Sequence, residues 1–150
     1  MIATSVFYDL VFVVHVMSAV ATIIVFVTMR YAAVAVARGG DAATQAARFP
    51  ERRNFAARLL HVLPVTGLIM SLSGGSSVSL SRPWVDVGIV CYLAAAGHLE
   101  ARTLPLERLV AGTIRREGRA PVDMGQRLLR SVDTLLVIIA VAMVTMLVQY

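Results

Sequence analysis

Four long apolar runs, separated by basic connectors, constrain this chain more than any other feature. The runs cover residues 6–28, 55–73, 84–100 and 132–148. A bilayer core is about 30 Å thick, so a spanning helix needs roughly 20 mostly apolar residues. Runs of this length without strict alternation exclude a β-barrel, and helices satisfy their own backbone in lipid. The sequence therefore predicts an all-α fold, an antiparallel four-helix transmembrane bundle in a single domain, residues 1–150.

The composition agrees with a membrane-embedded chain. Of the 150 residues, 58% are hydrophobic and the mean hydropathy is +0.77, more apolar surface than a soluble domain of this size could bury. The first run lacks a basic n-region and carries Asp9, so we expect a mature helix rather than a cleaved signal peptide. Cys91 is the one cysteine, which excludes an internal disulfide.

The positive charges predict the orientation. All 14 basic residues are arginines, and the net charge is +5. Because these arginines flank apolar runs, we expect a lipid bilayer as their partner and no nucleic acid. The second connector holds only Arg82, whereas the first and third hold the rest: Arg30, Arg38, Arg48, Arg52, Arg53 and Arg58, then Arg102, Arg108, Arg115, Arg116, Arg119, Arg127 and Arg130.

The positive-inside rule places both arginine-rich connectors in the cytoplasm. Met1 and Tyr150 should therefore both lie on the extracytoplasmic side. The use of arginine without lysine fits a GC-rich bacterial genome. The predicted location is thus the inner (plasma) membrane of a bacterium.

The first connector contains clear helix signals. The helical pattern of the first run continues to Arg38, and Gly39-Gly40 should stop it. Asp41 can cap a short helix, Ala42–Phe49, which Pro50 should end.

Prolines mark the next two runs. Pro64 should kink the second span, and a polar loop, Ser73–Ser81, follows that span. Pro83 suits the first turn of the third helix, and that helix should reach about Arg102.

The third connector, Thr103–Arg130, predicts a short amphipathic cytoplasmic helix lying on the membrane surface. Its apolar face holds Leu106, Leu109, Val110, Thr113 and Ile114. Its charged face holds Glu107, Arg108, Arg115 and Arg116. Gly118–Pro121 should break this helix, and Pro121 or Asp123 should open the lead into the fourth span.

The three histidines, His15, His61 and His98, all lie within or at the edges of spans. An ionisable residue at membrane depth suggests a functional site because its burial is expensive. The alternative is that a neutral histidine forms a hydrogen bond to a neighbouring helix. His15 is the strongest candidate, because it begins a face of small and polar residues: Ser18, Ala19 and Thr22.

The depths of the histidines limit how they could act together. His98 follows a small-residue face, Cys91, Ala94 and Ala95, and His61 lies at a similar depth, one turn after Arg58. His15 lies roughly two turns nearer the other surface. One haem ligated by both His15 and His98 would therefore require tilted helices.

A metal site has weaker support in the sequence. No two histidines lie four residues apart, and there is no Cys-x-x-Cys. Glu100 and Asp133 could assist a metal site, but we favour interfacial ion pairs, with Asp133 pairing to Arg130 or Arg102.

Several segments together resemble a superfamily of small bacterial membrane proteins. They are Phe12-Val-Val-His15-Val-Met-Ser, then Arg58-Leu-Leu-His-Val-Leu-Pro64-Val-Thr-Gly-Leu-Ile-Met-Ser, and Pro83-Trp84 before the third helix, with a basic connector before the fourth. This order is similar to a four-helix family of unknown function related to the CopD-type copper-resistance proteins and the HemJ-type protoporphyrinogen oxidases. Ser18-Ala-Val-Ala-Thr stands where a tryptophan and glycines usually follow the first-helix histidine in CopD and HemJ types, so the family of unknown function is nearest.

The resemblance implies roles for particular residues. In HemJ-like proteins the first-helix histidine is linked to haem b and a third-helix histidine is important, roles that would fall on His15 and His98 as iron ligands. Arg58 and Arg102 could pair with haem propionates, and His61 lies at the same level.

Three functional hypotheses stay open. The first is a haem-b-binding protein of redox or haem metabolism, and the third is copper or small-solute transport, which is weakest because no Met or His ladder crosses the spans. The second is favoured on physical grounds. It is a non-enzymatic accessory subunit that packs within a larger membrane complex, with a respiratory or redox assembly or a homo-oligomer as the candidate partner.

Overall fold

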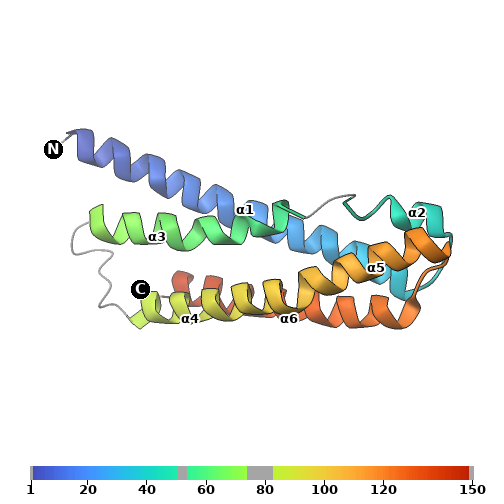
Figure 1. Ribbon diagram of the computed structural model, residues 1–150. Coiled ribbons are helices and arrows are strands. Elements are labelled where there is room, and N and C mark those ends of the chain that lie inside the picture. The colour runs from blue at the N-terminus through green and yellow to red at the C-terminus, as the bar shows by residue number, and fades with distance from the viewer. Residues whose placement is uncertain (1, 51–53, 74–82, 149–150) are drawn as a thin grey trace.

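The computed structural model describes residues 2–50, 54–73 and 83–148, which are helical apart from short connections. The elements are α1 (Ile2–Ala37), α2 (Ala42–Ala46), η1 (Ala56–His61), α3 (Val62–Ser73), α4 (Pro83–His98), η3 (Leu99–Thr103), α5 (Leu104–Glu117) and α6 (Val122–Leu147), shown in Figure 1. Three helical stretches, Val6–Ala37, Ala56–Ser73 and Val122–Leu147, are long and apolar enough to cross a membrane, as expected of an integral membrane protein.

The connection from α1 to α2 follows the predicted signals. Gly39 and Gly40 have φ values of 76° and 126°, a left-handed geometry that favours glycine and ends α1. The Asp41 carboxylate caps α2, because its Oδ2 accepts hydrogen bonds from the backbone N (2.8 Å) and the hydroxyl (2.7 Å) of Thr44. The predicted end of α2 at Phe49 was wrong, because the chain leaves the helix after Ala46 and turns so that the Phe49 side chain is buried.

The second span begins as a 3₁₀ helix, η1, and continues as α3. Pro64, which was expected to kink this span, is the third residue of α3. Proline has no N–H, so the carbonyl of Leu60 lacks its usual helical donor, and the tighter winding lies in this turn. The predicted loop over residues 74–81, and Arg52, Arg53, Arg82 and Tyr150, lie outside the described residues.

The third helix does not end at a separate connector. It runs from α4 through one π-helical segment, η3, directly into α5, visible as a continuous ribbon from yellow to orange in Figure 1. Pro105 lacks the N–H of a regular helical turn, and the wider π turn before it accommodates that loss without a break. The helix ends where predicted, at Gly118, which has a φ of 63°.

One residue of the predicted charged face of α5 was wrongly placed, because Glu107 is buried. From the predicted apolar face, Val110, Thr113 and Ile114 are buried and Leu109 is exposed. Glu107 is buried because of tertiary packing: α5 packs against α2 and α6 instead of contacting only a membrane surface. Asn54, which precedes η1, supplies the Glu107 carboxylate with a hydrogen bond.

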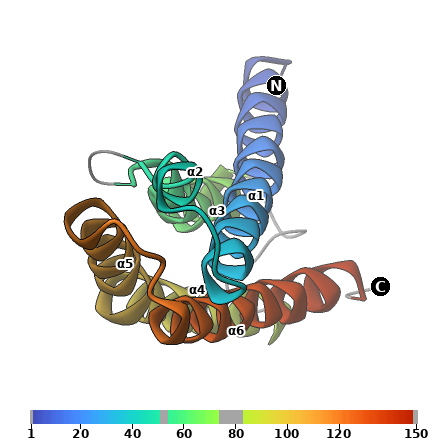
Figure 2. The same cartoon turned by 90° about the vertical axis from the view of Figure 1, so that its right-hand side faces the viewer.

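The buried core lies in the half of the molecule next to α2 and α5. α1 packs against α3 and α6, and α4 packs against α6. The fully buried core side chains include Phe26, Leu99, Val132 and Leu135. At the opposite end lie the start of α1 and the end of α6, which point away from each other in Figure 2.

Candidate functional site

His15 links α1 to α3. Its Nδ1 lies 2.7 Å from the hydroxyl oxygen of Thr66. The same hydroxyl also lies within hydrogen-bond distance of the carbonyl oxygens of Val62 (2.9 Å) and Leu63 (3.1 Å) on its own helix. Thr22, which was expected on the same interhelical face, is buried but donates to the carbonyl of Ser18 on its own helix.

His98 links α4 to α6. Its Nε2 lies 3.0 Å from the hydroxyl oxygen and 3.1 Å from the carbonyl oxygen of Ser131. The hydroxyl of Thr103 in η3 lies 2.8 Å from the same Ser131 hydroxyl. Ser131 and Thr103 are both buried, so one polar cluster joins α4, η3 and α6 within an apolar core.

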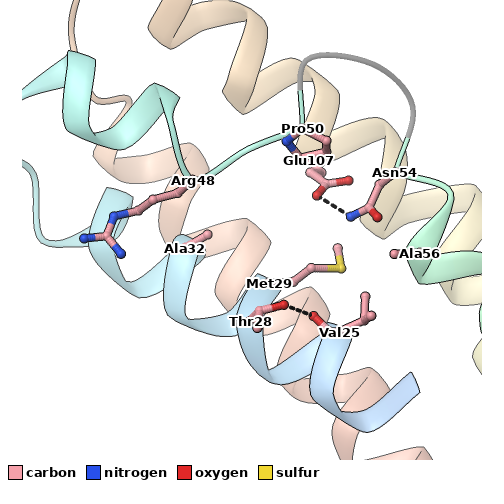
Figure 3. Close-up of a pocket in the computed structure, with 9 residues that line it drawn as sticks. All are labelled: Val25, Thr28, Met29, Ala32, Arg48, Pro50, Asn54, Ala56 and Glu107. Carbon is pink, nitrogen blue, oxygen red and sulfur yellow. Dashed lines mark hydrogen bonds between the residues drawn. The ribbon is translucent and has the colours of Figure 1, made fainter. Parts of the chain in front are cut away.

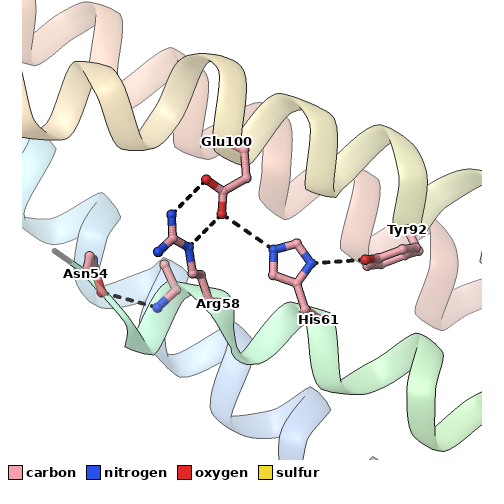
Figure 4. A network of polar contacts seen from close by, with 6 residues as sticks. Asn54, Arg58, His61, Tyr92 and Glu100 are labelled. Atoms are coloured by element: carbon pink, nitrogen blue, oxygen red, sulfur yellow. Dashed lines mark hydrogen bonds and ion pairs between the residues drawn. The ribbon is translucent and has the colours of Figure 1, made fainter.

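His61 belongs to a chain of polar contacts between η1 and the third helix, drawn in Figure 4. The Arg58 guanidinium donates to both carboxylate oxygens of Glu100, at 2.7 Å and 2.9 Å. The Nε2 of His61 lies 3.5 Å from the same carboxylate, and its Nδ1 lies 3.0 Å from the hydroxyl of Tyr92. This bidentate geometry makes the Arg58–Glu100 pair the strongest charged contact between these helices.

The histidines and arginines singled out in the sequence are thus distributed over three interhelical contacts. Arg58 and His61 meet at Glu100, while His98 and Arg102 line one surface groove and His15 lies at the separate α1–α3 contact. Among the residues that the structure describes, no group of three or more His, Cys, Asp or Glu side chains is placed to hold a metal ion.

Asp133 forms an interhelical ion pair, but not with the predicted partners. Its carboxylate accepts from the Nε of Arg30 in α1 at 2.7 Å. The predicted partners, Arg130 and Arg102, lie on α6 itself and on η3. The Arg30–Asp133 pair is not predictable from the sequence, because the packing of α1 against α6 that brings the two residues together is a tertiary feature.

Sequence reasoning missed the site around Glu107, shown in Figure 3. Asn54 Nδ2 donates to the Glu107 carboxylate at 2.8 Å, and Asn54 Oδ1 accepts from the backbone N of Ala57. Glu107 borders a cavity of about 210 Å³ that also contacts Met29 and Arg48. Burial raises the pKa of Glu107, with the Asn54 hydrogen bond and nearby Arg108 acting in the opposite direction.

Comparison with known proteins adds no assignment to this geometry. No protein-family model matches the chain, and neither the curated proteins nor the solved structures include a match.

Proposed function

We propose that this protein is a non-enzymatic accessory subunit that packs within a larger membrane complex, with a respiratory or redox assembly as the candidate. The observation that carries the proposal is that each histidine is hydrogen-bonded to a side chain of a different helical segment. Side chains held in this way act as ties between helices. The reactive candidates of the sequence therefore serve the architecture of the subunit.

The ties suit helices that must hold their relative positions in lipid. Apolar packing between helices gains little there from the hydrophobic effect, because lipid tails are as apolar as the side chains. Hydrogen bonds from His15, His61 and His98 and the ion pairs at Glu100 and Asp133 then fix which helix faces meet. A rigid, correctly assembled small bundle is what a partner protein can recognise.

A large apolar surface is available for the partner. In the half of the molecule away from α2 and α5, apolar side chains of four helices are exposed; they include Leu10, Met17, Ile24, Leu68, Leu72, Val90, Leu93, Val137 and Val144. Exposed apolar surface of this kind contacts lipid or another transmembrane protein. The proposal assigns part of it to the larger complex.

The proposal includes a fourth span and a topology. α4 alone has 16 residues, about 24 Å of helix, and its continuation through the five residues of η3 extends it to the length that a bilayer requires. With α1, α3 and α6 it would form an antiparallel four-helix bundle. α2 and α5, which carry the basic connectors, would lie in the cytoplasm of a bacterium, and both termini would lie outside.

One observation favours haem b binding as a second candidate. Nδ1 of His15 lies 2.7 Å from the Thr66 hydroxyl, so in the tautomer with the proton on Nδ1 the lone pair of Nε2 would be available to iron. A histidine whose second nitrogen is held by a hydrogen bond is the usual form of an iron ligand. In this candidate His15 acts as a single axial ligand, because His98 is engaged at Ser131 in a different contact.

A single purified preparation can distinguish the accessory role from haem binding. A tagged copy is purified in mild detergent from haem-replete cells, and its oxidised and dithionite-reduced spectra are recorded together with the proteins that accompany it. The accessory role predicts stoichiometric recovery of another integral membrane protein and, once this chain is separated from that partner, only protein absorbance from the chain itself. A Soret band that disappears in His15→Ala but persists in His98→Ala, with no accompanying membrane protein, would replace it with the haem candidate.

A further inference from the structure

An arginine-lined groove lies between the third helix and α6. Its volume is about 540 Å³, and its lining includes Arg102 of η3 with Arg127 and Arg130 of α6. These side chains come from two segments far apart in the sequence, which the packing of η3 and α5 on α6 brings to one place. Three guanidinium groups on one groove produce a local positive potential that attracts a phosphate group.

None of the described acidic residues is among those that line this groove. The carboxylates of Glu100, Glu107 and Asp133 are held by Arg58, Asn54 and Arg30 respectively. Asp123 lies one turn before Arg127 and has no ion pair with it within 4.0 Å among the described residues. The three arginines of the groove are exposed, so their positive charge is accessible to a ligand.

The same face of α6 changes from basic to apolar along its length. Arg127, Arg130, Thr134, Val137 and Val141 recur at spacings of three and four residues, so they form one stripe along the helix. Arg127, Arg130 and Thr134 line the groove, and Val137 and Val141 are 63% and 49% exposed beyond it. A basic end followed by an exposed apolar strip is complementary to an anionic phospholipid, whose charged headgroup is followed by an apolar acyl chain.

We propose that this groove binds an anionic phospholipid, with the headgroup phosphate on Arg102, Arg127 and Arg130 and an acyl chain along Val137 and Val141. Basic pockets between transmembrane helices at the membrane boundary bind lipid headgroups in this manner. A free phosphate would use only the arginines and would leave the apolar stripe without a role. The inference needs a membrane-spanning α6 and is independent of the accessory role proposed above.

The test uses the full-length protein in mild detergent. Native mass spectrometry follows binding of phosphatidylglycerol and of phosphatidylethanolamine with the same acyl chains, with glycerol phosphate as a third ligand. We expect the affinity for phosphatidylglycerol to exceed that for phosphatidylethanolamine by about tenfold or more. The affinity for phosphatidylglycerol should decrease as the salt concentration rises. Equal affinity for the two lipids would overturn the proposal, and equal binding of glycerol phosphate would assign the groove to free phosphate instead.

Matched variants locate the site. The triple variant Arg102→Gln, Arg127→Gln, Arg130→Gln should lose the preference for phosphatidylglycerol. The control Arg108→Gln, Arg116→Gln, Arg119→Gln removes the same charge from exposed α5-side arginines outside the groove and should keep the preference. Loss in both variants would show a nonspecific charge effect and contradict the proposal.

A second measurement does not depend on the folding of any variant. Phosphatidylglycerol with a photoactivatable acyl chain is crosslinked to the wild-type protein, and the modified peptides are identified. We expect the labels to concentrate on residues 134–141 of α6. Labels distributed equally over the exposed faces of α1, α3 and α6 would overturn the proposed chain path.

Discussion

Gly125 of α6 lies directly against the backbone of Ala37 at the end of α1. A β carbon at position 125 would lie 2.6 Å from the Ala37 nitrogen and 2.8 Å from Cγ1 of Val36. Only the absence of a side chain allows these two helices to approach so closely. The approach sets the relative position of α1 and α6, and therefore the Arg30–Asp133 ion pair that also joins them.

The first prediction concerns this contact. Gly125→Ala should lower the free energy of unfolding by about 1–3 kcal/mol, because two of the three nearest atoms, Ala37 N and Val36 C, are backbone atoms that cannot move without shifting a helix. The control is Gly97→Ala, where a β carbon would meet nothing within 4 Å. Circular-dichroism melts in detergent should show a lower midpoint for the first variant only. Equal midpoints would contradict the close approach.

The second prediction concerns the polar cluster at His98. Ser131→Ala removes the hydroxyl shared by His98 and Thr103 and should destabilise the protein by about 1 kcal/mol, within the range measured for hydrogen bonds between membrane helices. The matched control on α6 is Thr145→Ala, since the Thr145 hydroxyl donates to Val141 of its own helix. Similar stability losses in both variants would argue against an interhelical role for Ser131.

The third prediction is a pH dependence at Glu107. Because burial raises its pKa above the ordinary value of 4.5, the folded protein holds this proton more tightly than the unfolded chain. The contribution of Glu107 to stability should therefore fall as pH rises from about 4.5 through the raised pKa, and remain low above it.

Glu107→Gln keeps an acceptor for Asn54 and removes the charge, so it should be at least as stable as the wild type at pH 8 and lack this pH dependence. Melting midpoints of the wild type and of Glu107→Gln across the pH range measure this difference in stability. The control variant is Glu117→Gln, because Glu117 is exposed. A variant less stable than the wild type at high pH, with its deficit growing as pH rises, would show that the charged form is the stabilising one.

The sequence carried those features of the fold that depend on local chemistry. Gly39 and Gly118 end helices because glycine adopts a positive φ without strain. Asp41 caps α2 because its carboxylate reaches the backbone N of Thr44. The continuation of the third helix through Pro105 could not be predicted, since a proline usually ends a helix and the π turn depends on packing.

The candidate residues were also visible in the sequence, but their partners were not. The three histidines stood out because charge is costly at membrane depth. Their partners, Thr66, Tyr92 and Ser131, are ordinary polar residues 31 to 51 positions away, and nothing local distinguishes them. Glu107 was assigned to the solvent side because the helical period does not reveal that Asn54 covers it.

The fourth prediction tests the proposed topology. In a Cys91→Ser background, single cysteines replace Ser5, Ser77 and Arg116, and intact cells are treated with a membrane-impermeant maleimide. Cysteines at positions 5 and 77 should react from outside, and the cysteine at 116 should react only after the cells are opened. Labelling of positions 5 and 77 only from the cytoplasmic side would reverse the orientation.

The most direct test of the proposed accessory role is the composition of the native particle. Membranes that express the tagged chain at natural levels are crosslinked, dissolved in mild detergent, separated on a blue native gel and analysed by mass spectrometry. We expect the chain in a band with a larger integral membrane protein at constant stoichiometry, in the wild type and in Thr145→Ala. Migration only as a monomer or as a homo-oligomer would contradict the accessory role.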